Sequence, residues 1–218
     1  MEVEQAVKGK SKKKIAGIVI GCIIAAVVIV VIAARPPETV RPEPAIPAHF
    51  TTYTDESELF TISYPPEWEI DLEYMQELDH FSKEIIAAIT SDIPLEEGRF
   101  VFLAAPPLEA VNVNIVVEPI PAIMWTHDRV VTAAIESLKL VASDYHELSR
   151  VKTTVDNRPA TIIECQATLP VLGAFHYVFM ICIVNNTAWT VTCTALPDEH
   201  RYWESDFDAI VRSLRILK

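Results

Sequence analysis

Glycine, cysteine and histidine are scarce in this chain, and each shortage excludes a class of function. Only five of the 218 residues are glycine, too few and too scattered for a loop that cradles phosphates. No Gly-x-Ser-x-Gly sequence is present, which excludes the nucleophile turn of an α/β-hydrolase. The six histidines, at positions 49, 80, 127, 146, 176 and 200, lack the paired spacing of zinc sites, and no Cys-x-x-Cys accompanies them. We therefore predict no catalytic residue, no metal site and no cofactor, and expect that the chain is not an enzyme.

Basic residues are concentrated at the start of the chain. Residues 1–35 carry five Lys and one Arg against two Glu, a net charge of +4, and the rest carries −16, which gives −12 overall. So large an excess of acid argues against nucleic-acid binding and against adsorption to an anionic lipid surface. It permits a basic or cationic partner without requiring one.

One long apolar run, residues 15–34, contains no charged residue across its twenty positions. At about 1.5 Å per residue, a helix of that length spans the ~30 Å hydrocarbon core of a bilayer. Five Lys lie between positions 8 and 14, whereas only Arg35 and Arg41 follow closely, so the basic-side rule keeps the N-terminus cytoplasmic. We predict a cytoplasmic tail at 1–14, a signal-anchor helix in the lipid bilayer at 15–34, and an extracytoplasmic remainder at the cell membrane.

Two other interpretations fit the same N-terminal pattern. A cleaved signal peptide also begins with a basic region and an apolar stretch, but this run is too long and residues 33–36 make a poor cleavage site. Val19-Ile20-Gly21-Cys22 resembles the sequence at which bacterial lipoproteins are cleaved and acylated, yet twelve apolar residues continue beyond Cys22. The length of the run favours the uncleaved anchor.

Small residues recur on one side of the predicted membrane helix. Gly17, Gly21 and Ala25 are spaced by four, which would let two such helices approach closely and form a homodimer. Gly and Ala are frequent in membrane helices in any case, so the stripe is a weak signal for pairing.

Proline dominates the segment that follows, residues 35–48. Prolines at 36, 37, 42, 44 and 47 exclude a helix and favour an extended polyproline conformation. At ~3.1 Å per residue such a linker would hold a domain up to about 40 Å from the bilayer. It could serve to reach a partner, or simply resist proteases.

Residues 49–218 are expected to form one globular domain in which strands outnumber helices. Residues 59–65 alternate apolar and polar side chains and stop at Pro65-Pro66, as a half-buried strand would. In residues 111–118 we expect Asn112 and Asn114 to face outward between inward valines and isoleucine. Turn sequences at Asp156-Asn157-Arg158-Pro159 and Asn185-Asn186-Thr187 predict two hairpins. The further predicted strands are 99–104, 147–155, 160–168, 175–184 and 188–195.

Three amphipathic helices are predicted in the same domain. Apolar residues recur every three or four positions in residues 74–91, in 126–142 after a Thr126 cap, and in 201–217. Helices that interrupt an antiparallel meander indicate an α+β fold. We therefore predict an antiparallel β-sheet flanked by helices, an α/β/α sandwich, preceded by one transmembrane helix.

Three cysteines, Cys165, Cys182 and Cys193, lie in the predicted strands. Strand alternation places Cys182 and Cys193 on one face as diagonal neighbours, roughly 7 to 8 Å apart and beyond comfortable bridging distance. We expect Cys165 to share that face. Free cysteine packs as a small hydrophobe, so we predict buried core thiols.

Three stretches of the domain resemble the PsbP-like family, whose founding member is the extrinsic oxygen-evolving protein of photosystem II. Residues 60–68 (FTISYPPEW), 155–160 (VDNRPA) and 207–213 (FDAIVRS) carry the likeness, which covers about residues 50–218. The resemblance implies an antiparallel sheet flanked by helices, used as an extracytoplasmic or lumenal accessory module that docks on other proteins. Its motifs are structural, and they imply no metal-binding or photosystem-binding residue. The helix at 74–91 looks longer than the family's connection there.

These observations favour a membrane-tethered, non-catalytic accessory domain that binds an unknown protein. One alternative is a hydrolase or metal-dependent enzyme whose site assembles only in three dimensions, around Glu164, His176 and His146. Another is a sensor or transport subunit that captures a small apolar ligand between sheet and helix. Asn185-Asn186-Thr187 matches the N-glycosylation pattern, but Asn also suits a tight turn, so we expect no modification at Asn185.

Overall fold

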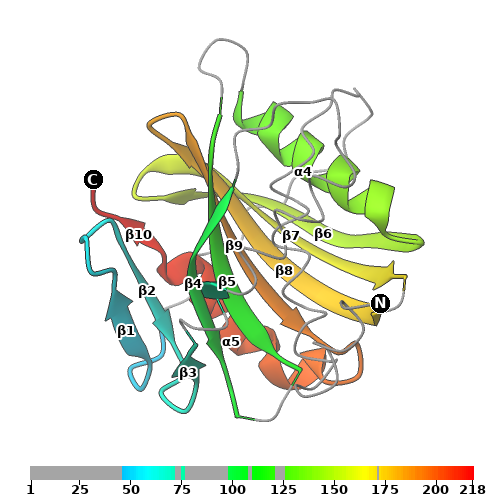
Figure 1. Cartoon of the computed structure of the whole chain (residues 1–218), viewed down its shortest axis with the longest axis horizontal. Helices are drawn as coiled ribbons and strands as arrows, with labels where there is room; N and C mark the ends of the chain where they lie inside the picture. Colours follow the sequence, from blue (N-terminus) through cyan, green and yellow to red (C-terminus); the bar gives the residue numbers. More distant parts are fainter. Residues whose placement is uncertain (1–45, 72–74, 77–97, 108–109, 121–125, 171) are drawn as a thin grey trace.

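Two antiparallel sheets and two helices make up the described part of the chain (Figure 1). In this computed structural model, residues 46–71, 75–76, 98–107, 110–120, 126–170 and 172–218 are described. The elements are β1 (Thr51–Thr54), β2 (Phe60–Tyr64), β3 (Glu69–Ile70), β4 (Arg99–Ala105), β5 (Asn112–Pro119), α4 (His127–Val141), β6 (Asp144–Val155), β7 (Arg158–Leu169), β8 (Gly173–Val184), β9 (Thr187–Ala195), α5 (His200–Ser213) and β10 (Arg215–Ile216).

The larger sheet has seven strands in the order β3-β4-β5-β9-β8-β7-β6. Every neighbouring pair is antiparallel, and β6 to β9 follow one another as a meander. A smaller sheet, ordered β1-β2-β10, joins strands from the two ends of the domain. The first and last parts of the domain are therefore held together by strand pairing on β2.

Both predicted hairpin turns are confirmed. The β6–β7 turn is Asp156-Asn157, with φ of 49° and 61°, and the β8–β9 turn is Asn185-Asn186, with φ of 50° and 58°. Two successive residues with positive φ form the turn whose twist matches the flanking strands. Asp and Asn tolerate this conformation better than other non-glycine residues do, so the local sequence fixes both hairpins.

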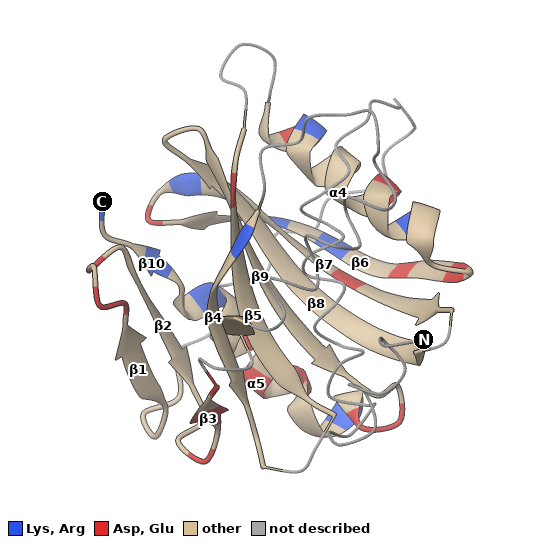
Figure 2. Cartoon of the chain, in the orientation of Figure 1, with Lys and Arg blue, Asp and Glu red and all other residues tan. Residues whose placement is uncertain are grey.

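The central strands of the large sheet are buried on both faces. On one face, Phe60 from β2 and Phe207 from α5 pack over residues such as Phe102, Met180 and Val191. On the other face, α4 packs against β6, β7 and β8 around residues such as Ile163 and Phe179. Charged side chains are accordingly excluded from the centre of the sheet. The central strands β8 and β9 carry no Lys, Arg, Asp or Glu (Figure 2).

The predicted helix-flanked α/β/α sandwich is wrong. Antiparallel strands dominate the described residues, and one face of the large sheet is covered by a second sheet together with α5. The helix predicted to run to 217 ends at Ser213, after which Ile216 pairs with Phe60 of β2. Leu214 and Leu217 fit a helical period in the sequence, but pairing with β2 takes this end of the chain into the small sheet. Leu217 is consequently 51% exposed.

The orientation predicted for two asparagines is also wrong. Asn112 and Asn114 are 3% and 0% exposed, although alternation along β5 placed them outward. They do lie on the face opposite Val113 and Ile115, but β5 runs between β4 and β9 and is covered on both faces.

No helix among the described residues is long and apolar enough to cross a membrane. The segment predicted to do so, residues 15–34, lies outside the described residues, as do the tail 1–14 and the pairing stripe of Gly17, Gly21 and Ala25. The linker 35–48 and the helix predicted at 74–91 also fall outside them, except for residues 46–48 and 75–76.

Candidate functional site

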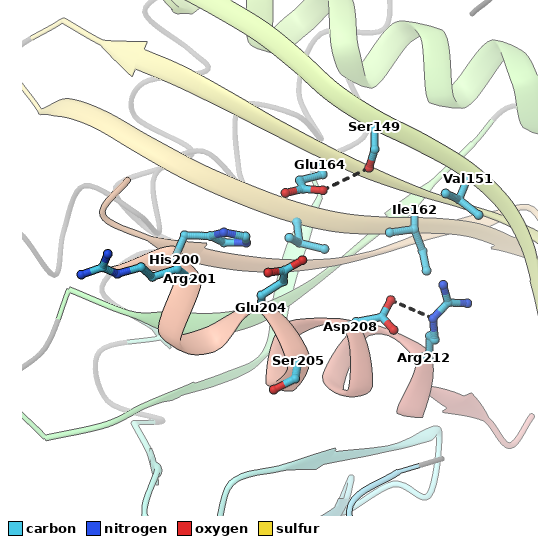
Figure 3. A pocket seen from close by; sticks show the side chains of 11 residues that line it. Ser149, Val151, Ile162, Glu164, His200, Arg201, Glu204, Ser205, Asp208 and Arg212 are labelled. Carbon is cyan, nitrogen blue, oxygen red and sulfur yellow. Dashed lines mark hydrogen bonds and ion pairs between the residues drawn. The ribbon is translucent and has the colours of Figure 1, made fainter. Parts of the chain in front are cut away.

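A cleft of about 360 Å³ lies between the β6–β8 end of the large sheet and α5 (Figure 3). The sheet side consists of Ser149, Val151, Ile162, Glu164 and Val178. The helix side consists of His200, Arg201, Glu204, Ser205, Asp208 and Arg212. Three valine and isoleucine side chains form an apolar floor, and carboxylates and two arginines stand around it. This cleft is the candidate site.

A β-bulge in β6 decides which side chains reach the cleft. The β6–β7 register shifts between Glu147 and Ser149, so that Ser149 lies opposite Glu164 and Glu147 lies opposite Cys165. The intervening residue, Leu148, is 51% exposed. If Leu148 were an ordinary strand residue instead of a bulge, two-residue alternation would turn Glu147 to the same face as Ser149. The bulge thus keeps the Glu147 side chain out of the cleft.

Glu164 is the centre of a hydrogen-bond chain on the sheet wall. Ser149 Oγ donates to Glu164 Oε2 at 3.2 Å, and His176 Nε2 lies 3.0 Å from Glu164 Oε1. Gln166 Nε2 lies 3.4 Å from His176 Nδ1, so Nδ1 accepts from the amide and Nε2 carries the proton. The hydrogen bond from His176 is the main reason that the pKa of Glu164 is lowered. Glu164 is therefore a carboxylate at neutral pH.

His200, the first residue of α5, stacks on His176. The ring centroids are 3.3 Å apart and the planes are 9° from parallel. His200 is only 7% exposed, and its Nε2 atom has no hydrogen-bond partner. Burial, reinforced by the neighbouring His176, lowers the pKa of His200 to about 4. The cleft therefore contains a neutral imidazole with an unsatisfied ring nitrogen.

Arg212 closes the opposite end of the cleft. Its Nε donates to Asp208 Oδ1 at 2.9 Å, one helical turn earlier, and its Nη1 donates to Thr153 of β6 at 3.3 Å. Arg212 is 5% exposed, so its charge is held by these partners. This contact fastens the last turn of α5 to the edge of the large sheet.

The order of the groups does not suit nucleophilic catalysis. In serine hydrolases the hydroxyl hydrogen-bonds to a histidine, which removes its proton, and a carboxylate orients that histidine. Here the carboxylate of Glu164 lies between Ser149 and His176, so Ser149 donates to an anion and has no adjacent base. Ser149 is therefore not activated for attack.

Glu164, His176 and His200 are near enough to share a metal ion, since one ligand atom from each lies within 4.8 Å of the others. A metal binds an imidazole along the lone pair in the plane of its ring. The two rings are stacked and nearly parallel, so a single ion cannot lie in both planes. The proton on His176 Nε2 also faces Glu164. Metal binding would require the stack to open and His176 to change its tautomer.

The structure brings together two of the three residues named by the enzyme hypothesis. Glu164 and His176 are hydrogen-bonded, but His146 is elsewhere, with a 68% exposed side chain that lies 3.2 Å from Asp144. His200 was not anticipated, because it reaches the site through the packing of α5 and not through spacing along the chain. Asn185, the glycosylation candidate, is exposed in the β8–β9 turn.

The three cysteines are free and buried, as predicted. The face predicted for Cys165 is wrong, because Cys165 packs on the α4 side while Cys182 and Cys193 pack on the α5 side. Cys182 lies opposite Trp189 and Cys193 opposite Val178. These two cysteines are therefore four register positions apart, about 13 Å along the strands, and are not diagonal neighbours.

The fold was compared with known proteins. No protein-family model matches the chain, and no curated protein matches it. Among solved structures, PsbP of the cyanobacterium Synechocystis sp. PCC 6803 is similar with a TM-score of 0.51 and 13% identity, over 78% of this chain and 93% of that one. The chain has a PsbP-like fold. LpqN, described as involved in cell envelope biogenesis of Mycobacterium tuberculosis, is similar with a TM-score of 0.51 and 10% identity, over 78% of this chain and 91% of that one. At such identities the likeness concerns the fold alone.

Proposed function

We propose that residues 49–218 form a non-catalytic accessory domain that binds another protein through the cleft between β6–β8 and α5. The cleft is the observation that carries this proposal. It is open, it combines an apolar floor with charged walls, and its serine is bound to a carboxylate instead of a base. Such a surface is suited to recognition, in which a few polar groups orient a partner over an apolar centre.

The location of the domain is part of the same proposal. Residues 15–34 anchor the chain in the cell membrane, with the N-terminus in the cytoplasm and the domain outside it. The support comes from the uncharged run and the lysines that precede it. The proline-rich linker at 35–48 then gives the cleft a reach of up to about 40 Å from the bilayer. Pairing of two chains through Gly17, Gly21 and Ala25 stays a prediction.

Site-specific photo-crosslinking in intact cells tests this function. A photoreactive phenylalanine analogue replaces Arg201, which is exposed at the cleft, or Leu140, which is 71% exposed on α4 at the other face of the sheet. We expect a defined crosslinked protein from position 201 and none from position 140. Equal products from both positions, or none from either, would contradict binding through the cleft.

A further inference from the structure

We propose that the cleft is a receptor for a lysine side chain presented by a basic segment of the protein partner. This inference rests on the proposed function and specifies the chemistry of its partner. The observations that carry it are two hydrogen-bond acceptors within 4.8 Å of each other, a carboxylate on the helix side of the cleft, and an apolar floor beside them.

The first two acceptors are Glu164 and His200. A ring nitrogen of His200 and a carboxylate oxygen of Glu164 lie within 4.8 Å of each other. An ammonium group placed between them can reach both, because each charge-assisted hydrogen bond is about 2.8 Å long. Glu164 is 26% exposed, so it retains access to the cleft after accepting from Ser149 and His176.

The third acceptor is Glu204. It follows His200 by four residues in α5, and residues so spaced share one face of a helix. In Figure 3 the side chain of Glu204 extends from the helix toward the sheet wall that carries Glu164. A lysine ammonium has three donors and no acceptor, so the exposed side chain of Glu204 offers it a third acceptor beside Glu164 and His200.

His200 supplies independent evidence for an occupant. Its ring is more than nine-tenths buried, yet its Nε2 atom has no partner. A buried polar atom without a partner destabilises a fold, and such a cost is commonly tolerated where a ligand supplies the bond. With its pKa lowered to about 4, His200 is neutral at pH 7. In the tautomer protonated at Nδ1, its Nε2 lone pair accepts a hydrogen bond from the ammonium.

The floor of the cleft accommodates the rest of the side chain. Val151, Ile162 and Val178 are 3%, 5% and 7% exposed, and they provide an apolar surface for four methylene groups. Arginine fits less well, because its planar fork requires a carboxylate with both oxygens free, and Asp208 already accepts from Arg212. The acidic charge of the chain after residue 35 also favours a basic partner.

A metal ion is the competing cation, and the ring geometry argues against it. The stacked imidazoles direct their lone pairs in separate planes, and His176 Nε2 is engaged with Glu164. An ammonium needs only the free nitrogen of His200 and leaves the stack intact. The arrangement therefore favours lysine over a divalent ion.

Nuclear magnetic resonance of the full chain in lipid nanodiscs tests the proposal. The probe is Nα-acetyl-lysine N-methylamide, and its matched control is the norleucine analogue, which has an aliphatic side chain without the ammonium. Long-range nitrogen–proton spectra report the hydrogen bond at each imidazole nitrogen. We expect the lysine probe to shift the His200 Nε2 resonance saturably, and the norleucine analogue to leave it unchanged.

Two variants sharpen the test. Glu204→Gln should weaken binding of the lysine probe about tenfold through loss of one charge-assisted bond. Glu136→Gln, on the partly exposed side of α4 away from the cleft, should leave it unchanged. The proposal is overturned if both probes shift His200 equally, if no probe does, or if zinc chloride shifts His176 and His200 together while the lysine probe has no effect.

The crosslinking experiment separates this proposal from the proposed function. Crosslinks from position 201 without any response to the lysine probe would retain a protein partner and overturn lysine recognition. A response to the lysine probe without crosslinks would support the ammonium site and overturn the protein partner.

Discussion

The imidazole rings of His176 and His200 stack with centroids 3.3 Å apart, although His176 belongs to β8 and His200 begins α5. The stack joins the sheet to the helix at the end of the cleft that contains Glu164 and His200. Both rings are buried, and Glu164 is hydrogen-bonded to only one of them. The pair therefore couples the stability of the cleft to pH.

Acidification should destabilise the domain through His200. Its pKa is about 4 in the folded protein and 6.5 ordinarily, so the unfolded chain binds more protons between these values. Stability should be complete above pH 6.5 and fall as the pH approaches 4, by about 2 kcal/mol. Glu164 acts in the same direction, because its pKa is lowered in the folded protein. Its contribution to stability is present at pH values above the ordinary pKa of the carboxyl group and is lost as the pH falls through the lowered pKa.

Denaturant unfolding at pH 7.0 and pH 4.5 measures this effect. In His200→Gln the difference between the two pH values should shrink, whereas in His146→Gln, which replaces an exposed histidine, it should match that of the parent chain. An undiminished pH dependence in His200→Gln would refute the assignment to His200.

Ser213 links the end of α5 to the small sheet. Its Oγ accepts from Ser63 N at 2.8 Å and lies 2.7 Å from Ile210 O, to which it donates. Ser213→Ala should lower the free energy of unfolding by about 1 to 3 kcal/mol, because the buried Ser63 N–H is left without a partner.

Thermal and denaturant unfolding of Ser213→Ala test this link. Ser143→Ala serves as the control, because Ser143 donates to Thr168 O in an exposed position, and it should change stability by less than about 0.5 kcal/mol. Equal effects of the two substitutions would show that the buried hydrogen bonds of Ser213 contribute no more to stability than the exposed one of Ser143.

The buried thiols should be unreactive until the chain unfolds. Burial raises the pKa of Cys182 to about 12 and raises that of Cys193 as well, so little thiolate is present at pH 8. In a Cys22→Ser background, a thiol reagent should label no cysteine of the native chain and all three after addition of denaturant without reductant. Fewer than three labelled thiols would indicate a disulfide.

Local sequence was sufficient for the hairpins and insufficient for the layers. Asp156-Asn157 and Asn185-Asn186 specify turns by their own conformational preferences. The strands β1, β3 and β10 have only four, two and two residues, too few to show a period. They form because they pair with strands from other parts of the chain, and the local sequence pattern does not indicate that pairing.

Part of the candidate site also follows from local sequence, and part depends on how distant elements pack. Glu164 and Gln166 are two residues apart on β7, and the register with β8 brings His176 beside them. That register depends on the length of the connection between Leu169 and Gly173, and a change of one residue would turn His176 to the other face. The same dependence explains the wrong face for Cys165. His200 depends on helix packing, which no spacing in the sequence reveals.

Deletion of Leu148 should be tolerated almost as well as its substitution. Leu148 is the extra residue of the β6 bulge and is 51% exposed, so Leu148→Thr removes little buried surface and should cost less than about 0.5 kcal/mol. Deletion makes Glu147 and Ser149 consecutive, and consecutive strand residues face opposite sides, as these two already do. The pairs Glu147–Cys165 and Ser149–Glu164 are therefore kept.

The deletion removes an exposed side chain and leaves both faces of β6 as they are, so it should lower the free energy of unfolding by less than about 1 kcal/mol. Urea unfolding of both variants provides the measurement. The response of His200 Nε2 to the lysine probe should persist, because Ser149 still lies opposite Glu164. A loss of more than about 2 kcal/mol on deletion would show that the bulge itself, and not only the pairing on either side of it, is needed for the fold.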